Sequence, residues 1–375
     1  MLSYAIPRTV LSLALLLGLA LTIGAVRGVA AEPAPLNGWR DVVAATPYAD
    51  SQGSYVNLIT IRRWVLTGSG FCEEPDRHIL FDRRMQFLGY LTDPGERAAN
   101  QTRINDERRR LAAAGRVTAW MPGSEGKSGY PFVLSCHQPD AFLPELVARY
   151  LGEDETARLW GTWDGLEVGS EAAPVSLHAA MREVYRQRRD AQRIALPETV
   201  LSTLAGKVII ESGGVRGAQS VAGAVGIMQL SPAGLADCRL EEPFVLHRLA
   251  QIDCALYLLD QNHRNLAPVF DRRFGHLPAG KASDLYRMLL VQSYHTGIGR
   301  VISLLDDPAL NAPARYFAAH EAQFSAGDMA LGMVFHNLGR EDLGFAALYY
   351  VADVAVAAAA VCGRVADLPG CERYD

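Results

Sequence analysis

The sequence predicts a mainly α protein in which a smaller mixed α+β domain, at 32–175, precedes a helical domain at 176–375. The chain has 375 residues, which is enough for two domains with their own cores. Short apolar alternations typical of strands occur in the first half, whereas helical periodicity dominates the second. The stretch 165–174 is rich in Gly, Ser, Ala and Pro without periodicity, so we place the boundary there.

The first 31 residues have the layout of a secretory signal peptide. Arg8 supplies a positive charge, an apolar run extends from Val10 to Val26, and the small residues at 28–31 fit a signal peptidase. We therefore expect a periplasmic protein whose mature chain begins near Glu32 and keeps no stable membrane span. The alternative is an uncleaved anchor, because the apolar run approaches spanning length.

Composition argues against several classes of function. The formal net charge of −5 gives no global basic field that would attract nucleic acid. Nine histidines are present, but no His-Glu-x-x-His pair and no His/Cys cluster with zinc spacing occurs. We therefore set a zinc peptidase aside and expect neither a metal nor another cofactor.

Cysteine usage agrees with export. Six cysteines form an even set without a Cys-x-x-Cys pair, so structural disulfides are the better interpretation. Six cysteines permit fifteen pairings, and we expect neighbours to pair. The predicted bridges are Cys72–Cys136, Cys238–Cys254 and Cys362–Cys371.

The N-terminal half alternates between strand and helix patterns. Strands are expected at 55–61, 117–120 and 131–135, and helices at 106–114 and 141–151. Tyr150, Trp160 and Trp163 form an aromatic cluster that would suit sugar stacking, but we favour burial in the core.

The C-terminal half reads as a series of helices. They are expected at 177–193, from 197 to Glu211, and at 243–264, 285–294, 299–305, 328–338 and 345–361. The last is almost continuously apolar, but Asp353 interrupts it. It therefore reads as a buried core helix rather than a membrane span.

Glu211 is the candidate catalytic residue. Val200, Leu204, Val208 and Glu211 follow each other at intervals of four, four and three residues, so they share one helix face. Gly213-Gly214 is a natural helix stop, which places the carboxylate at the negative end of the helix dipole. The apolar stripe and the dipole both disfavour an anion, and a general acid needs to hold its proton near neutrality.

Two motifs accompany Glu211. Glu211-Ser212 is followed at 220–232 by Ser-Val-Ala-Gly-Ala-Val-Gly-Ile-Met-Gln-Leu-Ser-Pro, and 293–301 reads Ser-Tyr-His-Thr-Gly-Ile-Gly-Arg-Val. These blocks resemble the signatures of Slt-type (family 1) lytic transglycosylases, in the lysozyme-like superfamily. The resemblance covers roughly 197–301 and implies a goose-type, Slt-like helical fold for the C-terminal domain. The N-terminal domain resembles no family that we can place.

The resemblance also implies roles for individual residues. Glu211 would be the single acid/base, and Tyr294 would hydrogen-bond its carboxyl. Ser220 and Gln229 would line the sugar subsites, and Tyr350, which resembles part of a closing Tyr-Val pair, would bind substrate. Gly223 and Gly226 would permit a tight backbone between them.

The chain departs from the family pattern at three positions. His295-Thr296 replace the usual Asn-Ala, and Ser231 stands where methionine is common. A histidine beside Tyr294 could bring a proton donor, but we expect a satisfied core residue there.

The resemblance implies cleavage of the MurNAc-β-1,4-GlcNAc bond of peptidoglycan glycan strands with formation of a 1,6-anhydro-MurNAc end. Asp237, Glu241 or Glu242 could instead position a water, which would give a hydrolytic muramidase. A third alternative is a non-catalytic peptidoglycan-binding scaffold, with an envelope or secretion apparatus as its partner. The intact Glu211 and Tyr294 argue against the scaffold.

Overall fold

A computed structural model describes residues 53–67, 77–82, 87–92, 95–116, 132–135 and 142–374, apart from 221, 339–342 and 366. The predicted signal peptide and the predicted strand at 117–120 lie outside these residues. Contacts group the chain from Leu36 to Asp375 into one compact unit. The boundary proposed at 165–174 stays a prediction.

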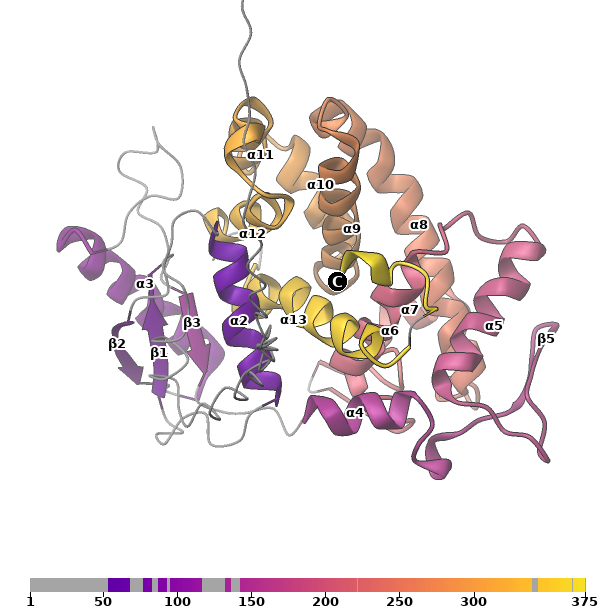
Figure 1. Ribbon diagram of the computed structural model, residues 1–375. Helices are drawn as coiled ribbons and strands as arrows, with labels where there is room; N and C mark the ends of the chain where they lie inside the picture. Colours follow the sequence, from indigo (N-terminus) through magenta and orange to yellow (C-terminus); the bar gives the residue numbers. More distant parts are fainter. Residues whose placement is uncertain are drawn as a thin grey trace, which may run out of the picture. The chain divides into compact units, whose positions relative to one another are not determined.

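The described chain is mainly α-helical, as predicted (Figure 1). Its first part contains helix α2 (Gly53–Thr67), strands β1 (Arg77–Phe81) and β2 (Phe87–Thr92), helix α3 (Arg97–Ala113) and strand β3 (Phe132–Ser135). The three strands form one antiparallel sheet in the order β2-β1-β3.

The strand predicted at 55–61 is wrong, because this segment belongs to helix α2. Its β-branched and aromatic residues favour a strand locally. Over the full helix, however, Leu58, Ile61 and Val65 are spaced by three and four residues and are all buried. Tertiary packing of that face therefore overrides the local preference.

The rest of the chain is a helical assembly with one small hairpin, β4 (Gly161–Trp163) and β5 (Leu166–Val168). The α-helices are α4 (Leu143–Tyr150), α5 (Leu177–Asp190), α6 (Val200–Ser212), α7 (Pro232–Asp237), α8 (Arg248–Phe274), α9 (Ala279–Thr296), α10 (Ile298–Asp306), α11 (Ala312–Ala319), α12 (Ala326–His336) and α13 (Phe345–Cys362). Short 3-10 helices span Glu155–Ala157, Glu321–Gln323 and Cys371–Arg373. Helices α7 and α11 had no counterpart in the sequence prediction.

Helix α13 runs between α2 and α6 and packs closely on both (Figure 1). Small residues allow the approach to α6. A Cβ added at Gly206 would lie 2.3 Å from the carbonyl oxygen of Val354, and Ala357 and Ala358 are fully buried. The run of alanines in α13 thus serves helix packing, and no described helix is long and apolar enough to span a membrane.

A buried ion pair joins α2 to α13. The guanidinium of Arg62 contacts the two carboxylate oxygens of Asp353 at 2.6 and 2.9 Å, and it also lies over the ring of Tyr349. Burial raises the pKa of Asp353, and Arg62 opposes that effect. Asp353, which interrupts the apolar pattern of α13, is therefore matched by a cation from the N-terminal part of the chain.

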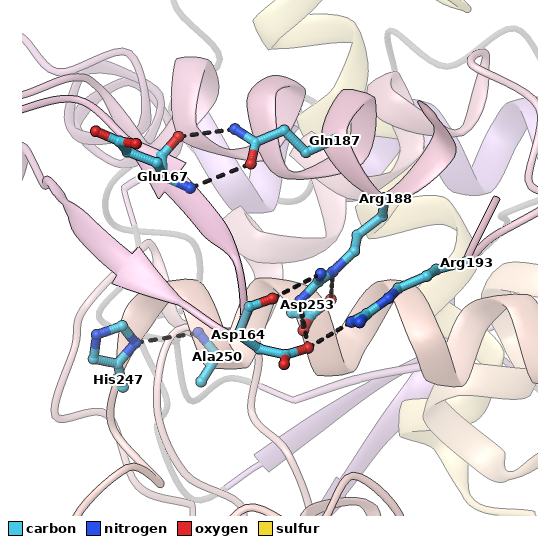
Figure 2. A network of polar contacts seen from close by, with 8 residues as sticks. All are labelled: Asp164, Glu167, Gln187, Arg188, Arg193, His247, Ala250 and Asp253. Atoms are coloured by element: carbon cyan, nitrogen blue, oxygen red, sulfur yellow. Dashed lines mark hydrogen bonds and ion pairs between the residues drawn. The ribbon is translucent and has the colours of Figure 1, made fainter. Parts of the chain in front are cut away.

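A second polar network anchors the β4–β5 hairpin to α5 and α8 (Figure 2). Arg188 of α5 is buried and binds both carboxylate oxygens of Asp253 at 2.6 Å. It also donates to the carbonyl and carboxylate of Asp164 in the hairpin turn, which Arg193 contacts as well. Gln187 pairs with the backbone of Glu167.

Two of the predicted disulfides are confirmed. Cys238 is bonded to Cys254, which ties the end of α7 to α8, and Cys362 is bonded to Cys371 after α13. The predicted Cys72–Cys136 bridge lies outside the described residues.

Candidate functional site

Glu211 lies in the last turn of α6, as predicted. The helix ends at Ser212, and Gly213 caps it in the left-handed conformation with φ of 60°. Every residue of α6 from Val200 to Ile209 is buried, so the helix is surrounded by protein rather than amphipathic. The side chain of Glu211 keeps 16% of its surface exposed. The carboxyl is thus held by a rigid buried helix but remains open to solvent.

Two side chains approach one oxygen of the Glu211 carboxyl. The hydroxyl of Tyr350, on α13, donates a hydrogen bond of 2.6 Å to Oε1. The Nζ of Lys207, one turn earlier on α6, lies 3.9 Å from the same oxygen. Among the described residues, no hydrogen-bond partner approaches Oε2. One carboxyl oxygen is therefore fixed, and the other is left for an incoming group.

The expected hydrogen bond from Tyr294 to Glu211 is wrong. Tyr294, on α9, donates its hydroxyl proton to the carbonyl of Met228 at 3.1 Å. Its ring covers Lys207, whose Nζ lies 3.1 Å from the ring centroid. Tyr350 makes the bond expected of Tyr294, so it contacts the candidate acid directly.

The hydroxyls of Tyr350 and Tyr294 keep their protons at neutral pH. Burial raises the pKa of Tyr350 well above its usual value, and the neighbouring Glu211 carboxylate adds to the effect. Burial and Glu211 raise the pKa of Tyr294 in the same way. Tyr350 is consequently a hydrogen-bond donor to Glu211 throughout the neutral range.

His295 is not the core residue that the sequence suggested. It is exposed, and its ring stacks on that of Tyr350 with centroids 4.4 Å apart and planes 15° apart. Partial desolvation of the ring by the groups packed around it lowers the pKa of His295, while Glu211 opposes that effect. The substitution for the usual asparagine therefore places an imidazole at the solvent side of Tyr350.

The loop after α6 folds as its glycines predict. Gly223 and Gly226 have φ of 80° and 76°, in the left-handed region. Ser220 accepts a hydrogen bond from the backbone of Ala224, and the amide nitrogen of Gln229 donates to the carbonyls of Ala218 and Gly226. The two predicted subsite residues thus brace their own loop, and their contact with sugar stays a prediction.

Sequence reasoning assigned no role to three supporting residues. Lys207 is the only charged residue in α6 before Glu211. It was overlooked because the helix was assigned from its apolar residues alone. Ser212 donates to the carbonyl of Ile227 at 2.7 Å and so ties the helix end to the loop. Gln251, fully buried on α8, accepts from the backbone of Met228 and donates to the carbonyls of Val225 and Val245.

The other candidate groups do not converge on Glu211. Asp237, Glu241 and Glu242 are exposed, as expected for surface carboxylates. Trp160 is 51% exposed, contrary to the expected burial, whereas Tyr150 is buried as expected.

Glu211 also lines neither of two surface cavities. One, of about 560 Å³, lies along α5, and the other, of about 600 Å³, lies beside the Cys238–Cys254 bridge.

The described residues include no group of three or more His, Cys, Asp and Glu side chains that could hold a metal ion. No protein-family model matches the chain, and no curated protein matches it in sequence.

Proposed function

We propose that the protein is a peptidoglycan lytic transglycosylase that uses Glu211 as its single acid/base. The observation that carries the proposal is the state of the Glu211 carboxyl at the end of a buried helix. Tyr350 holds Oε1, while Oε2 has no partner among the described residues. The two sequence blocks that resemble Slt-type enzymes supply the loop beside it and Tyr294.

The arrangement suits a reaction that needs one carboxyl in two successive roles. With Oε1 accepting from Tyr350, a proton on Oε2 is free to move to the glycosidic oxygen as the bond to C1 of MurNAc breaks. The carboxylate then takes the proton of the muramyl C6 hydroxyl, which closes onto C1 and forms the 1,6-anhydro end. Tyr350 would stabilise the anion between the two transfers.

The proposed reaction needs only one carboxyl. Inverting and retaining glycosidases ordinarily place two carboxyls across the scissile bond, about 5–9.5 Å apart. An intramolecular hydroxyl nucleophile removes the need for one.

The setting of this activity would be the periplasm, with glycan strands as substrate and an envelope or secretion apparatus as a partner. The predicted signal peptide and the two disulfides of the structure support an oxidising compartment.

The test is the release of muropeptides from purified sacculi by wild type and by Glu211→Gln, followed by mass spectrometry. The amide retains volume and the bond from Tyr350 but carries no transferable proton, so release should fall about a hundredfold to ten-thousandfold. Asp237→Asn is the matched control, because it removes an exposed carboxyl without touching Glu211.

Each outcome has a clear meaning. Release of 1,6-anhydro products by wild type and Asp237→Asn, but not by Glu211→Gln, supports the proposal. Products with reducing ends that disappear in Asp237→Asn would indicate a hydrolytic muramidase. Equal release by Glu211→Gln and wild type would refute the assignment of the acid, and binding of sacculi without any release would favour the scaffold.

A further inference from the structure

Lys207 is buried where a hydrophobic residue would cost less. Its side chain is only 3% exposed, in a stretch of α6 where all residues are buried. The Nζ has no hydrogen-bond partner among the described residues. Removing an ammonium from water is expensive unless other groups compensate for its charge.

Two groups face the Lys207 ammonium, and both favour its charge. The carboxyl oxygen Oε1 of Glu211 lies 3.9 Å away, and the ring face of Tyr294 lies 3.1 Å away. The spacing of four residues on one helix places Lys207 and Glu211 side by side. Tyr294 in turn is fixed by its bond to Met228 in the loop. The amine is therefore placed 3.9 Å from Oε1, with the ring of Tyr294 on another side.

On the premise that Glu211 is the acid of the proposed reaction, we propose that Lys207 is a positioning residue. Its charge attracts the carboxyl on the side of Oε1, which leaves Oε2 toward the substrate, and influences the pH range in which Glu211 acts as an acid. Lys207 itself touches no reacting atom.

The remaining groups around the pair do not carry out this function. From α13, Tyr350 is a neutral donor, and the carboxyl of Asp353 is bound to Arg62. From α9, Tyr294 is neutral, and partial desolvation lowers the pKa of His295, which favours its uncharged form. Among these described neighbours, Lys207 is the cation next to the carboxyl.

Burial brings the titration of Lys207 close to neutrality. It lowers the pKa of the amine to about 7, although Glu211 opposes the shift. Below that pH the ammonium favours the ionised carboxyl, and above it the amine becomes neutral. The charge beside Glu211 therefore changes near neutral pH.

The direct test follows the titration of the Glu211 carboxyl in full-length protein carrying ¹³C-labelled glutamate, with Glu211→Gln used to assign the resonance. Lys207→Met removes the cation and preserves the length of the side chain. An opposite charge at this distance typically displaces a titration by one to three pH units. We expect the Glu211 midpoint to move upward by about one unit or more in the variant.

Lys281→Met is the matched control, because Lys281 is the other lysine in the described part of the chain and is paired with Glu321. It changes the net charge equally and should leave the Glu211 midpoint in place. In the muropeptide assay, the high-pH limb of kcat/KM should move upward in Lys207→Met, because a general acid is lost when it deprotonates. Lys207→Arg, if folded, should restore the wild-type midpoint.

The result that would overturn the proposal is an unchanged Glu211 midpoint in a folded Lys207→Met variant. A change in melting temperature without a change in midpoint would reduce Lys207 to a structural residue. Because the titration needs no turnover, an inactive wild type would refute the proposed function and still leave Lys207 decided by its effect on the carboxyl.

Discussion

Replacement of Tyr350 by phenylalanine tests the geometry of the site most sharply. The change removes one hydroxyl, whose bond to Oε1 of Glu211 is 2.6 Å long, from a residue that is only 5% exposed. The ring and its stacking on His295 are kept. A hydrogen bond to a charged group contributes about 1.5–3 kcal/mol. If that energy acts on the anion formed during the reaction, kcat should fall by about 10- to 150-fold.

The control is Tyr294→Phe, which removes a partly buried hydroxyl from the neighbouring helix α9. That hydroxyl binds the carbonyl of Met228 and not the acid. Its loss should cost about 1 kcal/mol of unfolding free energy and only a small part of the activity. The assay is the initial rate of anhydro-muropeptide release at saturating sacculi, beside thermal unfolding of both variants. A larger loss of kcat in Tyr294→Phe than in Tyr350→Phe would refute the assignment drawn from these contacts.

Two further predictions concern stability. Gly226→Ala should lower the free energy of unfolding by about 3 kcal/mol or more, because the added Cβ would lie 2.1 Å from the side chain of Gln251 and φ is positive. Gly223→Ala has room for the Cβ, so backbone strain alone should lower the free energy of unfolding by about 1–2 kcal/mol. Chemical denaturation measures both, and equal losses would contradict the close approach. Lys207→Met should be more stable than wild type at pH 7, because burial lowers the pKa of Lys207 and so disfavours the charged amine in the folded state. This difference in stability should shrink as pH rises toward 10.5, where the amine of the unfolded chain also becomes neutral. Melting temperatures across that range test this, and a difference that does not vary with pH would contradict it.

The end of α6 was predictable because its signals are local. Glycine is the residue that takes the left-handed conformation freely, so Gly213 marks the stop wherever the helix lies in the fold. Gly223 and Gly226 predicted the tight loop for the same reason, because both take the left-handed conformation. The pairings of Cys238 with Cys254 and of Cys362 with Cys371 also follow from short separations along the chain.

The contacts of the site were not predictable from spacing. Tyr350 and Glu211 are 139 positions apart, so which tyrosine reaches the carboxyl depends on how α13 crosses α6. That crossing is set by Gly206 and by alanines whose role is visible only when the two helices are packed. Helix α2 was misread for a related reason, because its buried face is defined by partners far along the chain.

The ion pair between Arg62 and Asp353 limits how the chain can be truncated. Helix α13 carries both Asp353 and Tyr350, one turn apart, and rests on α2 from the N-terminal half. A protein fragment starting at residue 176 would lack α2, and the buried carboxylate of Asp353 would lose the cation that pairs with it. The helical half is therefore not expected to keep its structure by itself, and a fusion protein that contains it would also need α2.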